Sequence, residues 1–229
     1  MGAVTAHKLL LVFRWLSGSQ GSPGWPATLG PLRTRTGTVT LRPVKVRDAK
    51  TWSELRIRNQ NALLPWEPTG VGSWAERHQP GSWPPLFAVL KSEAKRGALL
   101  PFVIELDGRY VGQLTVGNIQ RGAVRTAWIG YWVDSAVAGN GIATAAVALG
   151  VDHCFGAVGL HRLDATVQPA NEASQKVLTN IGFRQEGLLQ RYMDVNKRWR
   201  DHMLFALTAE EVVGSAAEAL VRAGRASFH

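Results

Sequence analysis

The sequence of 229 residues contains a single cysteine and no apolar run long enough to cross a membrane. Cys154 alone cannot form an intramolecular disulfide, and such sparing use of cysteine is typical of proteins in reducing compartments. We therefore expect a cytoplasmic protein in which Cys154 is a small core residue rather than a catalytic thiol.

One short apolar run, Leu9 to Phe13, is the sole candidate for a targeting segment. It is too short for a membrane span, Arg14 follows it directly, and no Ala-x-Ala cleavage pattern lies downstream. We expect this run to form a short strand or helix that packs on the domain, without membrane contact.

Internal repeats and low-complexity tracts are also absent, so the length fits one domain with extensions. We expect an N-terminal arm over residues 1–36 that packs on or extends the domain, the domain itself over 37–208, and a C-terminal helix and tail over 209–229. We further expect a monomer or weak dimer without a metal site.

Acidic residues are scarce in the first sixty positions, and this scarcity accounts for most of the net charge of +9. Only Asp48 and Glu54 stand there against ten basic residues. The basic residues are Lys8, Arg14, Arg33, Arg35, Arg42, Lys45, Arg47, Lys50, Arg56 and Arg58. A solvated basic face and a surface that meets RNA, the ribosome or an acidic partner both remain open, although no aromatic RNA-binding signature accompanies the charge.

A glycine turn between a predicted strand and a predicted helix is the most informative stretch. The run from Thr126 to Val133 is rich in β-branched and aromatic residues, and Ala143 to Phe155 is rich in helix-forming residues. Gly139 and Gly141 lie between them and let successive N–H groups face an anion such as phosphate. The alternative is that the two glycines only supply the positive φ of a tight turn and bind no anion. Thr144 replaces the third glycine of a dinucleotide fingerprint, and no Gly-Lys-Ser/Thr of a P-loop follows.

The segment downstream makes the pattern specific. A strand over Leu160 to Val167 precedes Asn171-Glu172-Ala173-Ser174, which opens a helix that ends at Gly182-Phe183. This order resembles the GNAT superfamily of acetyl-CoA-dependent N-acetyltransferases, and within it the RimJ/RimL type, which acetylates protein N-termini. The resemblance covers roughly residues 37–208. It implies an α/β (α+β) fold with a mixed central sheet of about seven strands, helices on both faces and a splayed central parallel pair.

The resemblance also implies where acetyl-CoA is held. Backbone groups of Tyr131, Trp132 and Val133 would pair with the pantetheine arm, and Asn171 would orient it. The phosphates would meet the backbone N–H groups of Ala138, Gly139, Asn140, Gly141, Ile142, Ala143 and Thr144. Ala138 stands where the family has arginine or glutamine, so one side chain is missing but the backbone amides remain.

Acetyl transfer needs a neutral amine, a polarised thioester carbonyl and a proton for the departing thiolate. By resemblance, an N–H near Tyr131 polarises the carbonyl. Many relatives protonate the thiolate with a tyrosine at the position of Leu178, so Ser174 is the remaining candidate acid. Asn171 and Ser174 are also ordinary residues for a helix start, and this structural role is the alternative.

The base that accepts the proton of the amine is left open by the sequence. Glu67 in a tryptophan-rich loop, Glu105 on a strand and Asp134 after the pantetheine strand are candidates, and each could equally be a solvated carboxylate. A relay through water would also suffice, because an α-amine has a pKa of only about 7.7–8.0. Asp201 is expected to be structural.

The remaining elements follow from periodicity and turn signals. A first strand is expected over 38–42. One hairpin is expected from strands 102–106 and 110–116, with its turn at Asp107-Gly108. A second is expected from strands 184–195 and 199–207, with its turn at Asn196-Lys197. The expected helices are 49–64 capped by Asp48, 86–97, and 209–223 opened by a capping box at Thr208. The tryptophan-rich loop before Pro85 either lines a substrate cleft or covers the core.

These features predict an enzyme that transfers the acetyl group of acetyl-CoA to the α-amine at a protein N-terminus, a ribosomal protein being one candidate. A small-amine acetyltransferase acting on a polyamine or an aminoglycoside is the first alternative, but it would need a strongly acidic cleft. A non-catalytic module that binds acyl-CoA or RNA is the second.

Overall fold

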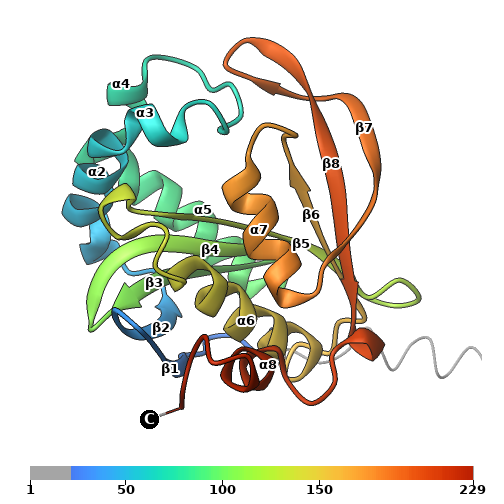
Figure 1. The fold of residues 1–229 in the computed structure, drawn as a ribbon. Helices are drawn as coiled ribbons and strands as arrows, with labels where there is room; N and C mark the ends of the chain where they lie inside the picture. Colours follow the sequence, from blue (N-terminus) through green and yellow to red (C-terminus); the bar gives the residue numbers. More distant parts are fainter. Residues whose placement is uncertain (1–21, 229) are drawn as a thin grey trace, which may run out of the picture.

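The computed structural model describes residues 22–228 and is built on one eight-stranded sheet (Figure 1). The strands are β1 (Leu29–Thr34), β2 (Gly37–Pro43), β3 (Leu99–Leu106), β4 (Arg109–Gln120), β5 (Thr126–Val133), β6 (Arg162–Val167), β7 (Arg184–Val195) and β8 (Arg198–Thr208). Their order across the sheet is β1-β2-β3-β4-β5-β6-β8-β7. The strand beyond the expected seven is β1, which lies in the stretch expected to be an arm and pairs with β2. The prediction for Leu9 to Phe13 lies outside the described residues.

Helices cover both faces of the sheet, as expected. They are α2 (Ala49–Arg58), α3 (Gln60–Leu63), α4 (Trp74–His78), α5 (Trp83–Lys95), α6 (Ile142–Phe155), α7 (Glu172–Ile181) and α8 (Ala216–Arg222). Alternate residues of β3 show why both faces are covered: Phe102 and Ile104 join the large core beneath α6, while Val103 joins a smaller core with Trp52 and Trp83. Cys154 is fully buried in the large core, as predicted.

The central parallel pair is splayed. Strands β5 and β6 pair only between Thr126–Trp128 and Arg162–Asp164, although β5 continues to Val133 and β6 to Val167. Beyond Trp128 the strand β5 keeps its antiparallel partner β4 but has no partner on the β6 side. The predicted splay is therefore confirmed, and backbone groups of β5 remain available on that edge.

The helix expected over residues 49–64 is broken at Asn59, which separates α2 from α3. The Asn59 side chain donates to the Leu55 carbonyl and to Asp134, and it accepts from the Ser135 backbone. It therefore anchors this bend to the end of β5. Asp48 occupies the N-cap position of α2 as predicted, but its side chain makes no capping hydrogen bond, because its carboxylate accepts from the Lys45 N–H at 2.7 Å and pairs with Arg42.

Two other helix boundaries differ from the expectation. Helix α5 begins at Trp83, because Pro84 and Pro85 fit a first helical turn, where no N–H is needed. The Thr208–Glu211 capping box exists, but it opens only a short 3₁₀ turn, and Gly214 at φ 77° precedes the separate helix α8.

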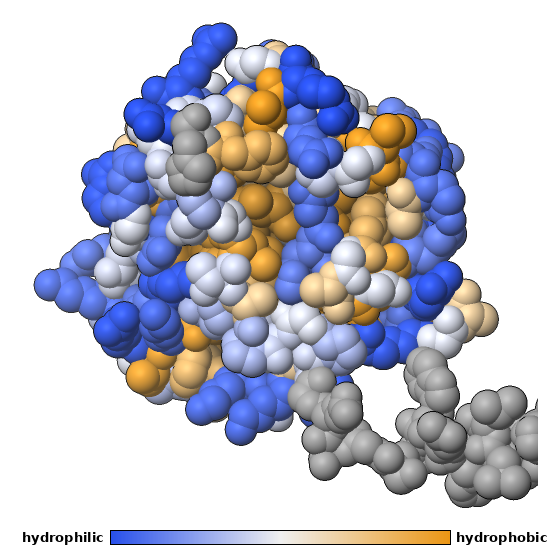
Figure 2. Space-filling model, turned by 90° about the horizontal axis from the view of Figure 1, so that it is seen from below, coloured by the Kyte–Doolittle hydropathy of each residue, from blue (hydrophilic) through white to orange (hydrophobic). Residues whose placement is uncertain are grey.

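The predicted hairpins at Asp107-Gly108 and Asn196-Lys197 are confirmed, and all four turn residues have positive φ. Figure 2 shows one face of the molecule, on which hydrophilic side chains surround and divide an apolar middle. Within residues 22–228, no helix is both long and apolar enough to cross a membrane.

Candidate active site

The glycine turn has the geometry that the sequence predicts. Gly139 and Gly141 have φ of 80° and 81°, and Gly141 is the N-cap of α6. A Cβ at either glycine would have no atom within 4 Å, so neighbouring protein does not require glycine there. The left-handed backbone requires it, and the outer side of the turn stays open to a ligand. The first N–H groups of α6 have no partner within the helix and face this opening.

A cavity of about 470 Å³ connects this turn to the splayed end of β5. Most of the predicted acetyl-CoA residues line it: Tyr131, Trp132, Val133, Ala138, Gly139, Gly141, Ile142, Ala143, Thr144, Asn171 and Ser174. We call it the cofactor cavity. Asn140 lines a neighbouring cavity on the other side of the turn, where its amide donates to the Val137 and Ala138 carbonyls.

That neighbouring cavity, of about 430 Å³, is lined by three basic side chains to which the sequence assigned no role in cofactor binding. Arg35 comes from the β1–β2 turn, Lys176 from α7 and Arg225 from the segment after α8. They stand beside the turn in which Ala138 lacks the family's side chain. A phosphate group at the turn would therefore meet positive charge in addition to backbone N–H groups. The present residues thus fit the phosphates, the pantetheine arm and the thioester of acetyl-CoA.

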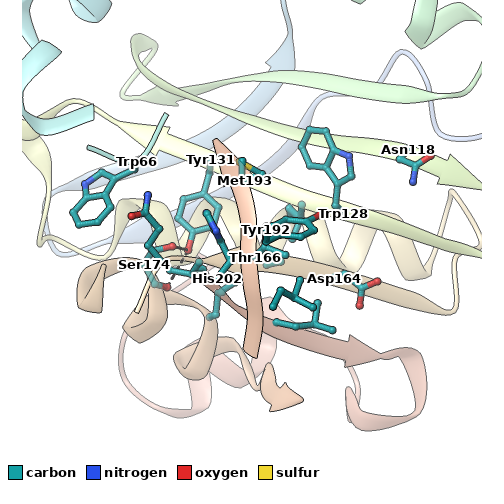
Figure 3. A pocket seen from close by; sticks show the side chains of 18 of the residues that line it. Trp66, Asn118, Trp128, Tyr131, Asp164, Thr166, Ser174, Tyr192, Met193 and His202 are labelled. Atoms are coloured by element: carbon teal, nitrogen blue, oxygen red, sulfur yellow. Dashed lines mark hydrogen bonds between the residues drawn. The ribbon is translucent and has the colours of Figure 1, made fainter. Parts of the chain in front are cut away.

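A third cavity, of about 560 Å³, lies between the splayed strands and the β7–β8 hairpin (Figure 3). Tyr131, Asn171 and Ser174 line both this cavity and the cofactor cavity. We call the third one the acceptor cavity, because it reaches the same residues from the other side. Two ligands in the two cavities would meet at Ser174 and Tyr131, which is the geometry that direct transfer needs.

Ser174 is held at this junction by two neighbours. Its N–H donates to Oδ1 of Asn171 at 3.1 Å, so Asn171 is the N-cap of α7, while both side chains also line the cavities. The Tyr131 hydroxyl lies 3.0 Å from Oγ of Ser174 and donates to the Ser174 carbonyl at 3.1 Å. Burial raises the pKa of Tyr131, so the phenol keeps its proton at neutral pH. The sequence predicted a role for the backbone of Tyr131 but not for its hydroxyl. Leu178 is fully buried.

The candidate carboxylates are dispersed rather than gathered. Glu67 lines the cofactor cavity and pairs with Nη1 of Arg56 at 2.8 Å. Glu105 accepts from Nε of Arg42 at 2.6 Å and lines neither cavity. Asp134 is buried against Arg58 and Asn59, also outside both cavities.

Asp201 accepts from the Arg191 N–H at 2.7 Å, which matches the structural role expected for it. Burial raises the pKa of the Cys154 thiol to about 12, so this thiol is not a nucleophile at neutral pH. The tryptophans divide between the two expected roles: Trp66 lines both cavities, whereas Trp74 and Trp83 are buried in the core.

The acceptor cavity holds a further residue that the sequence analysis missed. His202 on β8 is 3 % exposed and lines the cavity together with Tyr192 and Asp164. No local sequence motif marks His202, because it is distant in sequence from Ser174. The pairing of β8 with β6 brings it to the cavity that Ser174 lines. Trp128 and Tyr192 are about half exposed, at 43 % and 47 %, and add aromatic surface to the cavity.

Comparisons with known proteins agree with this geometry. Residues 38–184 match the acetyltransferase (GNAT) domain family. The structure of Mycobacterium smegmatis RimJ in complex with CoA-disulfide is 57 % identical and superposes with a TM-score of 0.90, covering 90 % of this chain and 99 % of that one. The [ribosomal protein uS5]-alanine N-acetyltransferase of Escherichia coli is 26 % identical over 190 residues, 82 % of this chain and 96 % of the relative.

The probable N-acetyltransferase YjcK of Bacillus subtilis is 43 % identical over 101 residues, which are 44 % of this chain and 56 % of that protein. These likenesses overturn the alternative of a non-catalytic module. The chain belongs to the GNAT family of N-acetyltransferases, it is an acetyltransferase that uses acetyl-CoA, and within the family it is similar to RimJ.

Proposed function

We propose that this enzyme acetylates the α-amine at the N-terminus of a protein, with a ribosomal protein as the acceptor. The observation that carries the proposal is the acceptor cavity, whose lining combines apolar, aromatic and uncharged polar side chains and is nearly free of charge. Asp164 is the single charged side chain among its lining residues, and it accepts from Nε of Arg162 at 2.7 Å. A peptide N-terminus carries no more than one positive charge and fits such walls, and the relative from Escherichia coli carries the name of an enzyme for the alanine of protein uS5.

A polyamine or aminoglycoside acceptor is disfavoured by the same observation. Such a substrate carries several positive charges, so its cavity would need several unpaired carboxylates. The acceptor cavity has one carboxylate, already paired, and Glu67 in the cofactor cavity is paired with Arg56. The small-amine reading therefore ranks second.

The proposed chemistry assigns one task to each residue at the junction. When bound, acetyl-CoA supplies the acetyl group as a thioester. Backbone N–H groups at the splayed end of β5 polarise its carbonyl, and Asn171 fixes the first turn of α7. Ser174 donates the proton that the departing sulfur needs, and the Tyr131 hydroxyl orients Ser174.

The basic N-terminal region supports contact with RNA less than its composition indicates. Arg42 pairs with Asp48 and Glu105, Arg56 with Glu67, and Arg58 with Asp134. These three arginines form ion pairs within the protein. Within the described residues, the basic surface available to RNA is therefore smaller than the number of basic residues indicates. Contact with the ribosome, cytoplasmic residence and the state of association stay predictions.

Incubation of the protein with acetyl-CoA and peptides that begin with Ala, Ser or Thr tests the proposal. We expect release of free thiol and, by mass spectrometry, one acetyl group on the α-amine. A peptide with a blocked N-terminus and an internal lysine is the control and should not react. Turnover of spermidine without turnover of any peptide would contradict the proposal in favour of the small-amine reading.

A further inference from the structure

The reaction needs a group that takes a proton from the acceptor amine, because an α-amine with a pKa of about 7.7–8.0 is largely protonated at neutral pH. The titratable residues that line the acceptor cavity are Asp164 on β6, His202 on β8, Tyr131 on β5 and Tyr192 on β7. Phenols as a class ionise near pH 10 and are poor bases at neutral pH. Asp164 is engaged by Arg162, so His202 is the group that remains.

The strand register places His202 at the end of the β6–β8 pairing, and its side chain lines the cavity that Ser174 and Tyr131 also line. Met203 pairs with Val167, the last residue of β6, so His202 lies one step further, where the chain leaves β6 toward α7 and Ser174. Asp164 lies three residues before Val167 on β6, about 10 Å along the strand at 3.3 Å per residue. Figure 3 shows His202 with Ser174 and Tyr131 at one end of the cavity, and Asp164 toward the other.

The imidazole of His202 is fixed in one tautomer. Its Nδ1 lies 3.1 Å from the Arg200 carbonyl oxygen, which can only accept, so Nδ1 carries the proton and the lone pair of the neutral ring is on Nε2. Among residues 22–228, no group hydrogen-bonds Nε2. The ring of Tyr192 packs edge-on against the imidazole at 5.6 Å between centroids and holds it in place. A buried, oriented ring with a free lone pair is what a general base requires.

We propose that Nε2 of His202 is the general base that takes a proton from the acceptor's ammonium group, directly or through one water. The freed amine forms the C–N bond with the acetyl carbon, and the C–S bond breaks. Ser174 gives its proton to the sulfur, and the second proton of the amine replaces it. The imidazolium then returns its proton to solvent. This assignment rests on the proposed role of the acceptor cavity.

The variant His202→Asn keeps an amide donor for the Arg200 carbonyl but removes the base. We expect kcat/KM to fall by about 10²–10⁴-fold at pH 6.5, with acetyl-CoA affinity unchanged. The loss should shrink strongly at pH 9, where the acceptor amine is already neutral. His161→Asn is the matched control, because His161 lies on the surface beside Glu210, outside both cavities. An equal loss at both pH values, or near-wild-type kcat/KM, would overturn the assignment.

Two further measurements separate a base from a merely structural residue. His202→Gly leaves space beside the acceptor cavity, and added imidazole should restore part of the rate in the way that an external base does. Asp164→Asn tests the competing group, and a pH-dependent loss there instead would contradict the assignment to His202. All variants are compared with the wild type on its best acceptor from a panel of peptides and small amines. If only small amines react, the proposed function fails while His202 is still tested.

Discussion

At the scale of single residues, the site depends on one hydroxyl held by two neighbours. Ser174 lies where the cofactor cavity and the acceptor cavity meet, with Asn171 and Tyr131 on either side. The superfamily's usual tyrosine is replaced by the buried Leu178, yet a phenol still contacts Ser174, because Tyr131 supplies it from β5. The chemistry at this point is thus distributed over two elements that are distant in sequence.

Ser174→Ala should lower kcat by about 10²–10⁴-fold, because the thiolate would leave without its acid. Acetyl-CoA affinity should change little, since Asn171 can still accept from the N–H of residue 174. Steady-state kinetics and titration calorimetry measure the two effects. Thr179→Ala removes a hydroxyl from the same helix outside the cavities and should behave as wild type. Near-wild-type kcat in Ser174→Ala would mean that another group protonates the sulfur.

His78 should make folding stability depend on pH. Burial, followed by the charge of Arg56, lowers the pKa of His78 to about 4, and the neutral ring donates to the Trp74 carbonyl while accepting from Arg56. Above pH 6.5 the ring is neutral in both states. As the pH falls from 6.5 toward 4, His78 becomes protonated in the unfolded chain but stays neutral in the folded one, so the free energy of unfolding falls.

Urea unfolding at pH 7 and pH 5 measures this effect. His78→Gln should be less stable than wild type at pH 7, because it disturbs the contacts with Arg56 and Trp74, but its stability should change less between the two pH values. An unchanged pH dependence in the variant would show that other groups cause the loss of stability.

At the scale of elements, we propose that the start of α6 governs acetyl-CoA binding. The left-handed conformation of Gly141 directs the first N–H groups of the helix to the open side of the turn. The splayed edge of β5 adds backbone groups that β6 leaves unpaired. In this proposal, backbone groups rather than side chains would provide most of the contacts with acetyl-CoA.

Gly141→Val should weaken acetyl-CoA binding by a large factor, because the side chain would occupy the open side of the turn. Gly159→Val is a matched control: Gly159 also has positive φ, at 73°, and open space around a Cβ, but it lies outside both cavities. Both variants should lose comparable stability, and only the first should lose affinity. Calorimetry and thermal unfolding distinguish the two effects, and equal affinities would refute the turn as the phosphate site.

At the scale of the whole molecule, three distant segments bring cations to the glycine turn. Arg35, Lys176 and Arg225 line one cavity although they are separated by most of the chain. We propose that their charge compensates for the side chain absent at Ala138. The eight-stranded sheet makes this possible, because the added strand β1 carries Arg35 toward the start of α6.

Arg225→Ala should weaken binding of CoA by roughly 2–5-fold at low salt, corresponding to the ~1 kcal/mol that an exposed ion pair contributes at most. The loss should be smaller for dephospho-CoA and should vanish at high salt. Arg47→Ala changes the net charge equally but lies outside the cavities, so its affinity should equal that of wild type. Equal losses in both variants would indicate a general effect of charge.

The sequence by itself determined the features that contiguous residues control. The glycine turn, the Asn171–Ser174 helix start and the hairpin turns depend on local backbone preferences, and all three occur where the sequence places them. The GNAT pattern could be recognised for the same reason. Helix boundaries were less predictable, because the break at Asn59 is set by its contact with Asp134, which is distant in sequence.

Only the tertiary structure decided which side chains meet. Strand register brings His202 into the cavity that Ser174 lines, packing of β5 against α7 joins the Tyr131 hydroxyl to Ser174, and Arg42 pairs with Glu105, which lies outside both cavities. Such encounters depend on pairing and packing between elements remote in sequence, and no local pattern encodes them. Most residues of the proposed cofactor side belong to one turn and the strand before it, so the sequence could predict that they line one cavity, whereas the acceptor cavity is lined by side chains from several strands that no local pattern brings together.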